Sequence, residues 1–179
     1  SSDVCSSDLA HSDLPRRVSK TLERTYKTEK IILEKIKPGE AGKSSELQGN
    51  FYRLTIPAQA QKSEYLYIGK VKTCRTGGCS LPSRPAPGED TEYFEYFMVF
   101  DAELKIKKIR IHNYQASHGH EITSRGWLKQ FVGFGGHKSL RVGKEIDSLT
   151  GATVSVYAIA KDVQSKTEIL HQLLKSSAD

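Results

Sequence analysis

Residues Glu92–Phe100 read EYFEYFMVF, and this stretch decides the fold. Aromatic or aliphatic side chains occupy both its even and its odd positions. A strand with one solvated face alternates apolar and polar residues, whereas a strand buried on both faces is nearly continuously apolar. The stretch therefore predicts a strand inside a sheet that other elements cover on both faces.

Further strands are predicted on either side of this one in the chain. They span Phe51–Ile56, Glu64–Thr73, Leu104–Ile111 and Lys138–Ile146. In the third of these the alternation slips by one residue at Lys107-Lys108, which is typical of a β-bulge. The turn Asp101–Glu103 precedes it and is short enough to make the pairing with Glu92–Phe100 antiparallel.

Helices are predicted before, within and after these strands. Ser19–Lys37 has apolar residues at three- and four-residue steps and ends at Pro38-Gly39. Trp127–Phe134 predicts a short helix, and Gly151–Lys175 predicts a long one with a single apolar stripe. The expected fold class is α+β, a mostly antiparallel sheet with these three helices packed on it.

Length and composition set limits on the class of protein. The chain has 179 residues, 37% of them hydrophobic, and a formal charge of +6. This favours one folded domain over a disordered chain, and the basic excess suits anionic partners. No apolar run approaches the ~18 residues that a membrane span needs.

The first nine residues, SSDVCSSDL, look like the translation of a sequencing adapter. We expect residues 1–9 to be an artefact, residues 10–50 to be a helix and linker, and residues 51–179 to be the main domain. Without Asp3 and Asp8 the charge becomes 27 − 19 = +8. A natural N-terminus with a signal or anchor is then expected to be missing from the sequence.

The segment most informative about function is Asp147–Ser155, DSLTGATVS, where the last predicted strand gives way to the long helix. Gly151 and Ala152 leave room for close approach, and the free N–H groups of a helix N-terminus bind anions. The alternative is simple capping, since Ser148, Thr150 and Thr153 are all good capping residues.

This motif resembles the Asp-x-x-Ser/Thr-Gly-Ala-Thr signature of the FMN-binding domain found in the G subunit of bacterial Rnf electron-transport complexes. The C subunit of the sodium-pumping NADH:quinone reductase contains the same domain. The resemblance implies that Thr153 carries FMN through a phosphoester and that residues 51–179 form the FMN-binding domain. The rest of the cofactor-binding pattern would be Asp147, Ser148, Thr150, Gly151 and Ala152.

A second match lies upstream. Ser117–Ile122, SHGHEI, and Trp127–Gly133, WLKQFVG, resemble the family's flavin loop and its Gln-Phe-x-Gly helix. The family commonly has Glu-Thr-Pro-Gly-Leu-Gly in the loop, so this chain keeps the glycine but changes its neighbours. The implied contacts to the flavin are Gly119, His120, Glu121 and Ile122.

The resemblance implies an extracytoplasmic electron-transfer flavoprotein, in the periplasm or on the outer face of the inner membrane. A separate flavin transferase, with FAD as donor and magnesium, would attach the FMN, and other redox proteins would be its partners. It would be a carrier or reductase component, membrane-associated through the missing N-terminus, without a catalytic residue or metal of its own. The alternatives are a non-covalent flavin or anion-binding module and, less favoured, a basic nucleic-acid-binding domain.

Two further features remain open. Cys74 and Cys79 lie in the Pro- and Gly-rich stretch 74–90, and a disulfide is favoured in an exported protein over a zinc half-site or a redox pair. The strand around Lys107 also carries a row of basic residues, which suits solvent, an acidic redox partner or a membrane surface. That row consists of Lys105, Lys107, Lys108 and Arg110.

Overall fold

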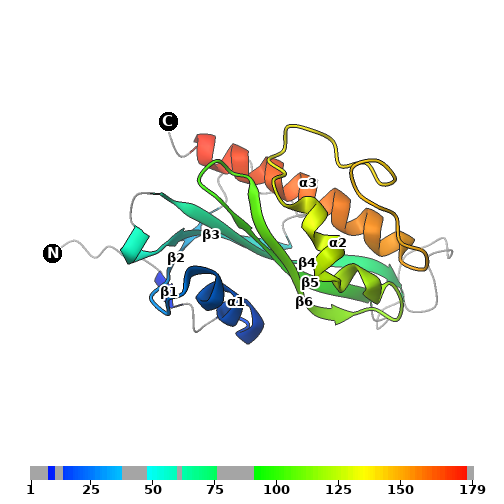
Figure 1. Cartoon of the computed structure of the whole chain (residues 1–179), viewed down its shortest axis with the longest axis horizontal. Coiled ribbons are helices and arrows are strands. Elements are labelled where there is room, and N and C mark those ends of the chain that lie inside the picture. Colours follow the sequence, from blue (N-terminus) through cyan, green and yellow to red (C-terminus); the bar gives the residue numbers. More distant parts are fainter. Residues whose placement is uncertain (1–7, 11–13, 38–47, 60–61, 76–90, 177–179) are drawn as a thin grey trace.

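The computed structural model describes residues 8–10, 14–37, 48–59, 62–75 and 91–176 (Figure 1). The strands are β1 (Asp8–Ala10), β2 (Ile32–Ile36), β3 (Gly49–Thr55), β4 (Glu64–Arg75), β5 (Thr91–Phe100) and β6 (Ile106–Gln115). The α-helices are α1 (Arg16–Tyr26), α2 (Arg125–Leu128) and α3 (Thr153–Ser176). Short 3₁₀ turns occur at η3 (Pro57–Gln59), η4 (His120–Thr123) and η5 (Lys129–Phe131).

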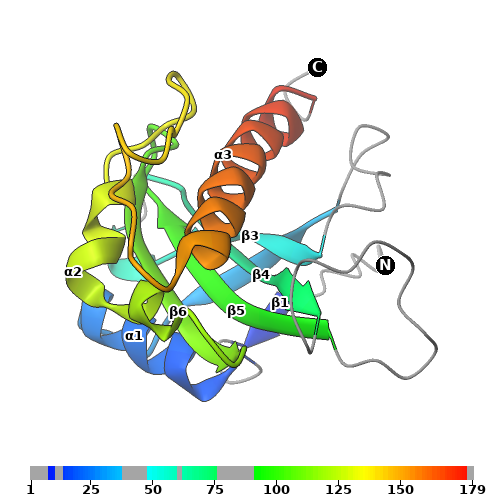
Figure 2. The same cartoon turned by 90° about the vertical axis from the view of Figure 1, so that its right-hand side faces the viewer.

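The six strands form one antiparallel sheet in the order β1-β2-β3-β4-β5-β6. Figure 2 shows α3 on one face of this sheet and α1 on the other. The predicted α+β class and the antiparallel sheet are therefore confirmed. No helix among the described residues is long and apolar enough to cross a membrane.

Strand β5 divides its side chains between two hydrophobic clusters, as its sequence predicts. Tyr96 and Met98 belong to the cluster beneath α3, whereas Phe97 and Val99 belong to the cluster beneath α1. All four side chains are at most 1% exposed. Successive residues of a strand point to opposite faces, so β5 joins the two halves of the core.

Two β-bulges interrupt the pairing of β5 with β6. Val99 pairs with Lys108 and Phe100 with Ile106, so Lys107 is the extra residue that the sequence predicted. A second bulge, which the sequence did not reveal, leaves out His112 between Ile111 and Asn113. Each extra residue changes which side chains of β6 point to a given face.

The helix predicted over Ser19–Lys37 is wrong in its second half. Helix α1 ends at Tyr26, because Lys27 takes a left-handed conformation (φ 54°). Ile32–Ile36 then forms β2, whose five residues pair with β3. Ile31 and Leu33 are buried two residues apart, the period of a strand, so sheet pairing overrides the helical spacing of Leu33 and Ile36.

Among the described residues of the region expected as helix and linker, Ile32–Ile36 is thus part of the main sheet. Both α1 and β2 contribute to the cluster beneath α1, together with residues of β3, β4 and β5. In addition, the backbone of Asp8–Ala10 pairs with β2, which includes Asp8 and Leu9 of the adapter-like stretch.

The strand predicted over Lys138–Ile146 is also wrong. Within the described residues this segment is a loop with one isolated bridge, between Val142 and Ile146. Gly143 has φ +85° and its N–H donates to the Ile146 carbonyl, so the chain turns back on itself. Ile146 is nevertheless buried, because the loop folds over the core.

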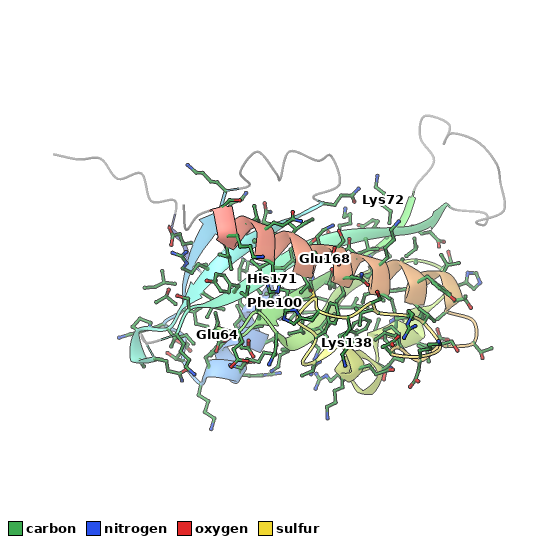
Figure 3. The ribbon with its side chains drawn as sticks, turned by 90° about the horizontal axis from the view of Figure 1, so that it is seen from above. Glu64, Lys72, Phe100, Lys138, Glu168 and His171 are labelled. Atoms are coloured by element: carbon green, nitrogen blue, oxygen red, sulfur yellow. The ribbon has the colours of Figure 1, made fainter. Side chains whose placement is uncertain are left out.

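The long loop between η5 and α3 is fastened to the helix. The Leu140 N–H donates to Gln164 Oε1 (3.0 Å), and His171 Nε2 lies 2.9 Å from the Gly135 carbonyl. Figure 3 shows His171 on α3, with Lys138 of this loop on the same side of the molecule. These contacts fix the approach of the chain to the N-terminus of α3.

Two-sided burial of β5 is testable with neighbouring residues. Met98→Ala should lower the free energy of unfolding by about 2–5 kcal/mol and Val99→Ala by about 1–3 kcal/mol, because each empties a fully packed site on a different face. Ile32→Ala, at a side chain that is 46% exposed, should cost less than about 1 kcal/mol. Urea denaturation measures all three, and a neutral Val99→Ala would show that α1 does not cover the sheet.

Candidate functional site

The segment Asp147–Ser155 turns sharply into the first turn of α3. Gly151 has φ +81°, a left-handed conformation that favours glycine, and the Ala152 N–H donates to the Leu149 carbonyl. The Ala152 carbonyl accepts from the Val156 N–H at 2.9 Å, so Ala152 is the N-cap of α3. Alanine has no side-chain oxygen with which to cap a helix.

Within the described residues, the hydroxyls expected to cap this helix do not do so. Ser148, Thr150 and Thr153 are exposed, and none of these hydroxyls has a hydrogen-bond partner in the part of the chain that the structure describes. The N–H groups of Thr153, Val154 and Ser155 likewise have no acceptor there. The capping alternative is therefore not supported by the geometry.

This arrangement can bind an anion. The Thr153 hydroxyl is exposed at the positive end of a 24-residue helix. Free N–H groups and the helix dipole both stabilise a negative charge at that position. Thr153 thus combines an exposed hydroxyl with nearby backbone donors that have no acceptor in the described residues.

The two segments matched in the sequence contact each other. Asp147 N–H donates to Gln130 Oε1 (2.8 Å), and Trp127 Nε1–H donates to the Asp147 carbonyl (3.0 Å). Gln130 in turn donates to the Trp127 carbonyl (3.0 Å). The segment Arg125–Phe131 therefore holds the start of the motif DSLTGAT in place.

The loop Ser117–Ile122 packs against the first turn of α3 through Gly119. This glycine is buried with φ +83°, and a Cβ there would lie 2.7 Å from Ser155 Oγ. Both the backbone conformation and the close approach require glycine. Ile122, the last residue of this loop, is fully buried in the cluster beneath α3.

Tyr114 ties this loop to α3, and the sequence did not point to it. Its hydroxyl donates to the His118 carbonyl (2.5 Å) and lies 3.1 Å from Ser155 Oγ. Partial burial raises the pKa of Tyr114, which keeps the hydroxyl protonated and able to donate. Its ring stacks on Phe94 (5.9 Å) and meets the ring of His120 edge-on (5.3 Å).

Thr153 and this loop lie on different sides of α3. Residues two apart on a helix point about 200° from each other, and it is Ser155 that faces the loop. Thr153 shares its side with Tyr157, which is 57% exposed and lines a cavity of about 510 Å³ between α3 and Arg141. Two surfaces therefore border the N-terminus of α3, one carrying His120 and Glu121 and the other carrying Tyr157.

The cysteine prediction remains a prediction. Cys79 lies outside the described residues, and of Cys74 only the backbone, in β4, is described. Among the residues that the structure describes, no group of three or more His, Cys, Asp or Glu side chains could hold a metal ion.

The role of Tyr114 can be tested by removing its hydroxyl alone. Tyr114→Phe should weaken the loop by about 1–2 kcal/mol and speed amide exchange over residues 118–123, because the carbonyl of His118 loses its donor. Tyr157→Phe removes an exposed hydroxyl from the other side of α3, away from the loop, and should leave that exchange unchanged. Hydrogen–deuterium exchange mass spectrometry measures the exchange rates. Equal rates over residues 118–123 in the two variants would contradict this role.

Comparison of the chain with protein-family models, curated proteins and solved structures gives no match. The resemblance to the FMN-binding domain accordingly rests on the residues of Asp147–Ser155 and Ser117–Gly133. In this structure those two segments are joined by hydrogen bonds at Asp147 and by the packing of Gly119 on Ser155.

Proposed function

We propose that this protein is an extracytoplasmic electron-transfer flavoprotein that carries FMN esterified to Thr153. The observation that carries the proposal is the exposed Thr153 hydroxyl at a helix N-terminus that has no side-chain cap among the described residues, within the motif DSLTGAT. The contact of that motif with the Gln-Phe-x-Gly helix through Asp147 supports it further.

Attachment would need an outside enzyme. A threonine hydroxyl is a weak nucleophile, and no hydrogen bond within the described residues joins Thr153 to a base that could activate it. The flavin transferase would direct Thr153 Oγ onto the FAD phosphorus that is bonded to riboflavin. The new O–P bond forms as the bond from that phosphorus to AMP breaks, the hydroxyl proton passes to a base of the transferase, and AMP leaves with magnesium neutralising the pyrophosphate. Exposure of Thr153 leaves it accessible to such an enzyme.

The side chains around Thr153 would hold and tune the cofactor. Bound FMN supplies reversible electron transfer, while the protein provides position and electrostatics. The N–H groups at the start of α3 bind the phosphate, and the covalent link prevents loss of the cofactor between cycles. The loop presents the His120 ring and the Glu121 carboxylate, both exposed, beside the helix terminus.

The proposed partners follow from that role. The protein would exchange electrons with other redox proteins rather than act on a soluble substrate of its own. Its expected location is the periplasm or the outer face of the inner membrane, where the flavin transferase would load it.

The attachment residue can be tested by co-expression with a flavin transferase. The wild type and Ser139→Ala should both show flavin fluorescence in a denaturing gel, and Thr153→Ala should show none. Ser139 is the control because it is an exposed hydroxyl of the loop that leads to α3 and lies outside the motif. Fluorescence that persists in Thr153→Ala would contradict the proposal.

A non-covalent flavin site gives a different result. The purified protein would then be yellow, and denaturation followed by filtration would release the colour from the wild type as well as from Thr153→Ala. That outcome would contradict covalent attachment and would instead support a module that binds flavin non-covalently.

The side of α3 on which the flavin lies can be tested with two carboxylates. If the ring lies over the loop, Glu121→Gln should raise the midpoint potential by roughly 20–40 mV, because a nearby negative charge opposes reduction. Glu145→Gln is the matched control on the other side, where Glu145 pairs with Arg141 (2.7 Å). A rise in Glu145→Gln alone would place the ring beside Tyr157 and Arg141 instead.

A further inference from the structure

A second pocket lies on the opposite face of the sheet from α3. It has a volume of about 400 Å³ and opens between α1, the outer strand β6 and the segment from η4 to α2. Phe97, which belongs to the cluster beneath α1, and Ile111 form its apolar part. Neither Thr153 nor the loop residues Gly119–Ile122 are among the side chains that line it.

The charge of this pocket is its most unusual property. Six cationic side chains line it, and none of the described lining residues is acidic. Three of the six lie along one side of α1 at i, i+3 and i+7, two come from β6, and one comes from α2. They are Arg17, Lys20, Arg24, Lys108, Arg110 and Arg125.

These cations are not neutralised within the described part of the chain. Two neighbouring cations are neutralised, since Lys105, directly before β6, pairs with Glu103, and Lys107 of β6 pairs with Glu64. No such ion pair is found for the six pocket cations in the described residues. Burial and mutual repulsion also lower the pKa of Lys108 and of Arg110, the expected result of crowding cations without an anion.

A buried histidine gives independent evidence for a ligand. His112 is only 9% exposed, lines the pocket, and has no hydrogen-bond partner for Nε2 in the described residues. A buried polar atom without a partner costs free energy and calls for an explanation. The β-bulge at His112 holds it there, with its carbonyl accepting from Arg17 Nη1 (3.1 Å).

Several of the cations are held in position before any ligand arrives. Lys108 Nζ donates to Thr25 Oγ1 (2.6 Å), and Arg110 Nη1 donates to the carbonyl of Ile109 (2.7 Å). Arg17 is fixed by its bond to His112. Side chains that are already ordered lose little conformational entropy when a ligand binds.

We propose that this pocket binds a small polyanion that carries at least two phosphate groups, either a free phosphorylated compound or the headgroup of a phospholipid. Guanidinium groups bind phosphate oxygens in pairs, and Arg17, Arg24 and Arg125 approach from two elements. His112 Nε2 gains a phosphate partner, and an apolar part of the ligand rests on Phe97 and Ile111. The site stands independently of the flavin at Thr153.

The test uses inorganic pyrophosphate as the probe and the imidazole signals of His112 in NMR as the reporter. In the wild type these signals should shift saturably during the titration. The variant pair Arg24→Gln and Arg125→Gln, made together, removes two exposed cations of the pocket and should weaken binding by roughly tenfold or more. Arg16→Gln with Lys129→Gln removes two exposed cations from the same regions outside the described lining, and should bind as the wild type does.

A second arm separates the two sources of phosphate. Sedimentation with phosphatidylcholine vesicles, with and without cardiolipin, tests for a diphosphate headgroup. Cardiolipin-dependent binding that is lost in the Arg24/Arg125 double variant, without a response to pyrophosphate, assigns the site to a lipid headgroup. A response to pyrophosphate alone assigns it to a free compound.

Three results would overturn the proposal. One is the absence of any saturable response to either probe. Another is equal weakening in the two double variants, which would indicate only the general positive field of the protein. The third is binding of single-stranded oligonucleotides with no response to pyrophosphate or cardiolipin, which would make the surface a nucleic-acid interface.

Discussion

The structure depends on the burial of β5 from both sides. Tyr96 and Met98 support α3, while Phe97 and Val99 on the same strand support α1, so neither helix has a core of its own. Of the two sites inferred for this protein, one lies at the N-terminus of α3 and the other beside the outer strand β6.

The outer strand β6 contributes side chains to both sites, one on each face of the sheet. Tyr114 points to the face of α3 and joins the loop at Gly119 to Ser155, whereas His112 points to the face of α1 and lines the basic pocket. The bulge at His112 allows two residues so close in sequence to serve opposite faces. The proposed attachment site for FMN and the pocket proposed to bind a polyanion are consequently separated by one strand.

Elements with a strong local sequence pattern were predicted correctly. The prediction failed for elements whose conformation is decided by contacts with residues far along the chain. Continuous apolarity predicted β5, and the slip in alternation at Lys107 predicted the bulge in β6. Ile32–Ile36 has helical spacing as well, and only pairing with β3 makes it a strand. In the site, DSLTGAT marked the terminus of α3. The anchoring of Asp147 by Gln130 and the bridge made by Tyr114 depend on residues brought together from far along the chain, which no local pattern encodes.

The central claim, a flavin ester at Thr153, is tested most directly by peptide mapping of the protein after co-expression with a flavin transferase. Cleavage after Lys144 and Lys161 gives a peptide of residues 145–161 that contains every hydroxyl of the motif. Fragmentation should place a mass of one FMN less one water on Thr153. An unmodified peptide from a sample loaded with FAD and magnesium, or the same mass on Ser148, Thr150 or Ser155, would contradict the account.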